Sequence, residues 1–136
     1  MKIFVSGQIE DIEYVRKVQS EFIEAGHEIT HDWTTNETGA KMLGSREAKL
    51  GDPEESKKRA TNDINGVVNS DVYVICTDNE NVGKGMYVEI GAALGLHTKF
   101  NTPKIYLLGA MNHMSIFYLH PSVMQVNSVD DILRSL

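Results

Sequence analysis

Glu89 is the residue of this sequence whose surroundings most suggest chemistry. It lies in the run MYVEIGAALG, residues 86–95, where it is the only charged side chain. Such a carboxylate has two interpretations. It is either a first-turn acid that faces solvent and complements the helix dipole, or a partly desolvated nucleophile or base that nearby glycines allow a substrate to approach. Spacing alone leaves both interpretations open.

Asp63 is a second carboxylate that could share the work. It borders an apolar stripe at helical spacing, predicted to be buried and formed by Ala60, Ile64, Val67 and Val68. Asp63 is either an ordinary acid at the margin of this stripe or one member of a catalytic pair. In such a pair one carboxylate attacks carbon while the other handles a proton.

The segment 77–86 connects a predicted strand to a predicted helix and is rich in polar residues and glycine. Backbone N–H groups at such a helix start favour an anion or a sugar hydroxyl. Candidate binding residues here are Asn81, Gly83, Lys84 and Gly85, with Lys84 able to contribute charge toward a phosphate. Neither the dinucleotide glycine motif nor the P-loop motif is present, so a nucleoside triphosphate or dinucleotide site is not expected.

Other residue types give weaker signals. The five histidines form no metal-ligand pattern, so we expect no metal and no cofactor. Ser6 and Ser115 lack a nucleophile-elbow context, which argues against serine-hydrolase chemistry. Trp33 either walls a base-binding pocket or packs beneath a long loop.

The elements that must position these residues alternate between strand and helix. We predict strands at Lys2–Ser6, 28–30, 71–76, Lys104–Leu108 and 122–126, helices at 10–25, from 53 after an Asp52 cap, 85–96 and 128–136, and a loop at 32–51. This order predicts one α/β domain over residues 1–136, a doubly wound, flavodoxin-like or Rossmann-like sandwich with a parallel sheet of about five strands. Ligands bind beyond the carboxyl ends of such strands, which makes Gly7 a candidate binding position.

Composition narrows the kinds of partner. The net charge of −6 argues against nucleic acid polymers and anionic membranes, so a small molecule is expected. Cys76 is the single cysteine and lies in an apolar run, which predicts a buried core thiol. The sequence shows neither a signal peptide nor a membrane span, and a cytoplasmic protein is expected.

Several segments in this order resemble the nucleoside 2-deoxyribosyltransferase family. They are NDING at residues 62–66, SDV at 70–72, VGKGM at 82–86, EIGAA at 89–93, and NHM at 112–114. The resemblance spans most of the chain and is strongest between residues 62 and 93. It implies a nucleoside or nucleotide as substrate.

The resemblance also implies roles for individual residues. Glu89 would attack the anomeric carbon of a deoxyribose and form a covalent glycosyl-enzyme, which a second base or water then resolves. Asp63 would protonate the departing base and must itself be protonated at that moment. Asn112 and Met114 would act in a neighbouring subunit's site, so a homo-oligomer, at least a dimer, is expected.

Three positions depart from the family pattern. Phe4 replaces a tyrosine that hydrogen-bonds the nucleophile, Asn81 replaces an aspartate that holds the sugar's 5′ hydroxyl, and Gly83 replaces a serine found near the phosphate in monophosphate hydrolases. The first expectation is transfer of 2-deoxyribose between bases. The alternatives are hydrolysis of nucleosides or nucleoside 5′-monophosphates and a non-catalytic nucleotide-binding module.

Overall fold

Five short segments pair side by side as parallel strands in the computed structural model, which describes residues 1–35, 53–79 and 84–136. The strands are β1 (Lys2–Ser6), β2 (Glu28–Ile29), β3 (Val72–Cys76), β4 (Lys104–Leu108) and β5 (Val123–Val126), in the spatial order β2-β1-β3-β4-β5. This order and the parallel pairing confirm the predicted doubly wound α/β fold.

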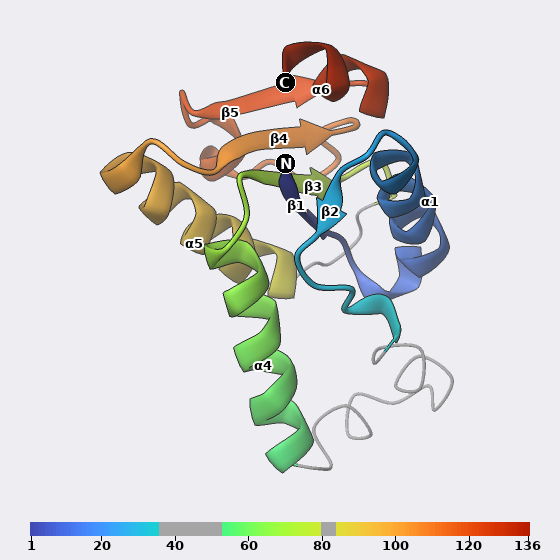
Figure 1. Cartoon of the computed structure of the whole chain (residues 1–136). Helices are drawn as coiled ribbons and strands as arrows, with labels where there is room; N and C mark the ends of the chain where they lie inside the picture. Colours follow the sequence, from blue (N-terminus) through green and yellow to red (C-terminus); the bar gives the residue numbers. More distant parts are fainter. Residues whose placement is uncertain (36–52, 80–83) are drawn as a thin grey trace.

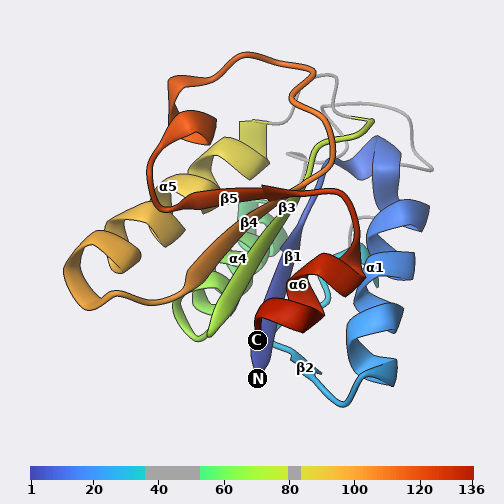
Figure 2. The same cartoon turned by 90° about the horizontal axis from the view of Figure 1, so that it is seen from above.

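The helices cover both faces of the sheet (Figures 1 and 2). They are α1 (Ile12–Glu24), α4 (Pro53–Val68), α5 (Lys84–Phe100) and α6 (Val129–Ser135), with short 3-10 helices at Ile9–Asp11 and Ile116–Leu119. Helices α1 and α6 contact each other on one face, and α4 and α5 contact each other on the other. None of the helices in the described ranges combines the length and apolarity needed to cross a lipid bilayer.

Strand β3 lies at the centre of the sheet and is buried along its whole length. Strands covered by helices on both faces become continuous apolar runs, which explains the sequence VYVIC. The Cys76 thiol is buried as predicted. Burial raises its pKa well above the ordinary value, so the thiol stays protonated and inert.

The strand order reverses between β1 and β3, because the chain leaves β1 toward β2 and returns to β3 on the opposite side. The helix that follows β1, α1, lies on one face of the sheet, and the helix that follows β3, α5, lies on the other (Figure 2). Doubly wound proteins bind their ligands at this switch point. Ser6 ends β1 at this place and Cys76 ends β3.

Most predicted bounds lie within two residues of the observed ones, but two predictions were wrong. Helix α5 extends to Phe100 rather than ending at residue 96. Thr34 and Thr35 are helical where a loop was predicted, because the Asp32 carboxylate accepts the Thr34 backbone N–H at 3.0 Å and caps the turn. The rest of that predicted loop, together with the predicted cap Asp52, lies outside the described residues.

The predicted buried stripe of α4 was also largely wrong. Val67 is fully buried, but Ile64 is only half-buried, Ala60 is exposed and Val68 is 48% exposed. Figure 1 shows the reason, since the amino-terminal half of α4 runs away from the sheet and only its last turns lie against the fold. The spacing of the apolar residues predicted the helix correctly, but it did not predict how much of the helix packs against the rest of the protein.

Candidate active site

Glu89 lies on the buried side of α5 and is 8% exposed. The Ser6 hydroxyl, from the carboxyl end of β1, donates a hydrogen bond of 2.7 Å to Glu89 Oε1. This burial rules out the solvent-facing interpretation of Glu89. The structure instead places the carboxylate at the switch point between β1 and β3, bonded to a side chain 83 positions away in the sequence.

Ser6 reaches Glu89 because side chains two positions apart on a strand point to the same face. Phe4 and Ser6 therefore both face α4 and α5, while Val5 faces the opposite side. Sequence reasoning considered Ser6 only as a nucleophile and missed it as a hydrogen-bond donor. The sequence did contain a clue to this role. Ser6 lies two positions after Phe4, so its hydroxyl is on the face of β1 where the resemblance expects a tyrosine hydroxyl.

Tyr73 of β3 completes a cluster around the carboxylate. It pairs in register with Phe4, and the two rings stack with centroids 6.1 Å apart. Its phenol donates a 3.4 Å hydrogen bond to the Met86 carbonyl of α5. Burial, and then the negative charge of Glu89, raise the pKa of Tyr73 well above its usual value, while a hydrogen bond with Ser6 acts in the opposite direction. The phenol therefore stays neutral beside the carboxylate.

Phe4 was predicted to bind substrate, but it is fully buried. Gly66 of α4 covers its ring, and a Cβ on Gly66 would come within 2.7 Å of Phe4 Cδ2. The ring also stacks on Tyr73. Phe4 thus packs between the sheet and α4 rather than lining an open surface.

Asp63 approaches the same face of the sheet from α4. Its Oδ1 lies 3.3 Å from His31 Nε2, and the two side chains are 27% and 20% exposed. Asp63 is one helical turn before Gly66, which packs against Phe4. Because α4 and α5 contact each other, the two predicted carboxylates come from adjacent helices.

Polar side chains tie together the segments that follow β1, β3 and β4. Gln8 donates a 2.6 Å hydrogen bond to the Asn79 carbonyl, and Asn79 donates at 3.0 Å to Asp11 Oδ1. Asn112 donates to the carbonyl oxygens of Thr77, at 2.9 Å, and Asp78, at 2.6 Å. The predicted residue Asn112 therefore lies at the carboxyl edge of the sheet, bound to the end of β3 in its own chain.

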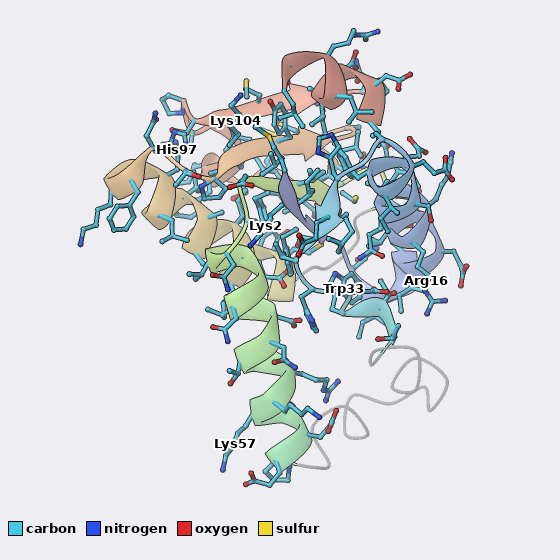
Figure 3. The ribbon with its side chains drawn as sticks, in the orientation of Figure 1. Lys2, Arg16, Trp33, Lys57, His97 and Lys104 are labelled. Atoms are coloured by element: carbon cyan, nitrogen blue, oxygen red, sulfur yellow. The ribbon has the colours of Figure 1, made fainter. Side chains whose placement is uncertain are left out.

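Trp33 and Gly7 pack on the opposite side of β1, beside α1. Trp33 is buried, and its indole N–H donates to the Val5 carbonyl at 2.8 Å, while Arg16 of α1 donates to neighbouring Thr34 at 3.1 Å (Figure 3). This agrees with the packing interpretation of Trp33. Gly7 has no room for a side chain, because a Cβ there would collide with Val15.

The remaining predicted binding residues fall near the start of α5. Lys84 begins the helix and Gly85 follows. Apart from its chain neighbours and the backbone of its own helix, no atom of the described residues lies within 4 Å of the position a Gly85 Cβ would take. Asn81 and Gly83 lie outside the described residues. Met114 is 80% exposed in the segment between β4 and β5.

Comparison with known proteins identifies a solved structure with the same fold. No protein-family model matches the sequence, and no curated protein matches it. Among solved structures, the Clostridium botulinum CMP N-glycosidase BcmB aligns with a TM-score of 0.55 over 99% of this chain and 97% of that chain, at 19% sequence identity. At that identity the likeness establishes a shared fold, and this chain has the same doubly wound architecture as that glycosidase over nearly its whole length.

Proposed function

We propose that this protein cleaves the N-glycosidic bond of a nucleoside 5′-monophosphate through a covalent intermediate on Glu89. The observation that carries the proposal is the 2.7 Å hydrogen bond from Ser6 to a carboxylate that is only 8% exposed at the switch point. A carboxylate that is held in place and shielded from bulk water is suited to attack a carbon atom.

The reaction follows from the two carboxylates. The Glu89 carboxylate attacks the anomeric carbon as the bond from that carbon to the base nitrogen breaks, and the bonding electrons leave with the base. Asp63 donates a proton to the base, so that a neutral base departs. Water then attacks the anomeric carbon, gives a proton back to Asp63 and releases the Glu89 carboxylate.

The likeness to a CMP N-glycosidase supports a nucleoside monophosphate as the substrate class. Helix α5 follows β3, so its amino terminus lies at the carboxyl edge of the sheet. The space beside Gly85 is open within the described residues. Backbone N–H groups of a helix start favour a phosphate. These features support a 5′-phosphate near the first turn of α5.

Transfer of the sugar to a second base is the other candidate, because it uses the same glycosyl-enzyme. Asn112 favours it, since an asparagine stands in the loop where the resemblance expects the N-x-M segment of the transferases. Hydrolysis and transfer differ only in what resolves the intermediate. An acceptor base in the assay therefore separates them.

Incubation of the protein with CMP, dCMP, the other nucleoside 5′-monophosphates and the matching nucleosides tests the proposal. We expect free base from a monophosphate, whether or not a second base is added, and slower release from the nucleoside that lacks the phosphate. Chromatography separates base, nucleoside and nucleotide. A new nucleoside that forms only with an added base would establish transfer, and no product from any substrate would favour the non-catalytic binding module.

We also propose that a second copy of the chain covers an apolar patch beside the site. The patch consists of Met114, Ile116, Phe117 and Leu119, which are 80%, 78%, 57% and 60% exposed. Contiguous exposed apolar residues usually mark an interaction surface. An assembly of this kind would let Met114 reach the neighbouring subunit's site.

Phe117→Asp is expected to convert an oligomer into monomers and to lower activity, because it places a charge in the proposed interface. Analytical ultracentrifugation gives the subunit count. Ile23→Asp is the matched control, since Ile23 is equally exposed at 57% but lies on α1, on the opposite face of the sheet. An unchanged sedimentation coefficient for Phe117→Asp would contradict the interface.

A further inference from the structure

We propose that His31 is a positioning residue that provides, through Asp63, the proton taken up by the departing base. This inference rests on the proposed function and adds a residue to it. His31 follows β2, and Asp63 lies on α4, so the pair brings two separate elements together at the carboxyl edge of the sheet.

The contact between His31 and Asp63 is held by the backbone around it. A Cβ on Gly66 would come within 2.9 Å of the His31 Cβ, so α4 approaches this segment as closely as glycine allows. The Thr30 hydroxyl donates to the Gly66 carbonyl at 2.8 Å. The residue before His31 is thus tied to α4 one turn after Asp63, which keeps the imidazole beside the carboxylate.

The charges around His31 favour a shared proton. Of the charged groups in the described residues, Asp63 is the one placed against the ring, at 3.3 Å. Asp32, the next residue, turns its carboxylate to the Thr34 hydroxyl at 2.6 Å instead. Both members of the pair are mostly shielded, with side-chain exposures of 20% and 27%, so solvent screens their interaction less than at an open surface.

The proton balance is simple. The proposal requires that the pair hold one proton before the base departs, between His31 Nε2 and the Asp63 carboxylate, which lie 3.3 Å apart. As the base departs, this proton passes from His31 Nε2 to the Asp63 carboxyl and from there to the base, which leaves a neutral imidazole and a carboxylate. When water attacks the glycosyl-enzyme, the water proton returns to the pair.

His31→Gln tests this role with two substrates that differ in their need for a proton. GMP requires protonation of its base, whereas 7-methyl-GMP already carries a positive base that departs neutral. We expect the variant to lower kcat by about 100-fold for GMP, the scale of general acid catalysis, and by less than threefold for 7-methyl-GMP. Because both rates come from one preparation, their ratio does not depend on the folded fraction.

The pH profile of kcat is the second readout and uses whichever monophosphate the wild type cleaves fastest. Wild-type kcat is expected to fall as the pH rises, because the pair must hold a proton for the base to depart, and His31→Gln should change that dependence. His27→Gln is the matched control, since His27 lies before β2 with its Nδ1 bonded to the chain's amino terminus at 3.0 Å.

The outcomes separate this inference from the proposed function. Equal losses on GMP and 7-methyl-GMP, or an unchanged pH profile in His31→Gln, would show a structural role and overturn the inference while the proposed function stands. A wild-type protein that cleaves neither substrate nor any other monophosphate would overturn both. A loss confined to GMP, together with the altered pH profile, would establish the role of His31.

Discussion

Glu89→Gln is expected to reduce turnover by roughly 10⁴-fold or more, the scale seen when a covalent nucleophile is removed. The amide is nearly the same size as the carboxylate, and its oxygen can still accept the hydrogen bond from Ser6. It cannot displace the base from the anomeric carbon. The fold should survive, because the change replaces a buried charge with a neutral group and leaves the packing of α5 intact.

Trapping of the glycosyl-enzyme tests the same prediction directly. A 2-fluoro analogue of the substrate should add the mass of one glycosyl group to the wild-type protein, and the adduct should map to the peptide that contains Glu89. Glu89→Gln should gain no mass. Glu13→Gln is the control, since the Glu13 side chain is 83% exposed on α1. An adduct on the Glu89→Gln variant, or activity near the wild-type rate, would refute the nucleophile.

The architecture could be predicted from the sequence, because hydrophobic periodicity and the residues that end strands and helices are local features. Strands β1 and β4 were predicted with their observed bounds, since each is an apolar run followed by a glycine. The α4 stripe failed for a non-local reason. The sequence of residues 53–68 does not indicate that half of the helix extends beyond the sheet. The spacing of its apolar residues therefore predicted more burial than the structure shows.

The candidate site was predictable in its carboxylates but not in their partners. Glu89 stood out because its neighbours are apolar, which is a local property. Ser6 and His31 did not, because a serine at a strand end and a lone histidine are ordinary until the fold brings them to Glu89 and Asp63. Phe4 shows the same limit, since only the approach of Gly66 reveals that its ring is covered.

Ser6→Ala is expected to lower kcat by about 10- to 150-fold with little change in KM, which corresponds to the roughly 1.5 to 3 kcal/mol of a hydrogen bond to a charged group. The hydroxyl fixes the direction of the Glu89 carboxylate and stabilises its charge in a buried site. Substrate binding does not require that bond, but attack on carbon does. Steady-state kinetics on the preferred monophosphate separate kcat from KM.

Ser70→Ala controls for effects on stability. Ser70 is also buried, and its hydroxyl donates to the Val67 carbonyl at 2.7 Å at the carboxyl end of α4. It should lose stability but keep kcat. Adding Phe4→Tyr to Ser6→Ala should recover part of the rate, since position 4 points a hydroxyl to the same face of β1. Full activity in Ser6→Ala would mean that Tyr73 and the surrounding backbone hold Glu89 without it. Recovery by Phe4→Tyr would instead show that a hydroxyl on this face of β1 is what the carboxylate needs, whichever of the two residues carries it.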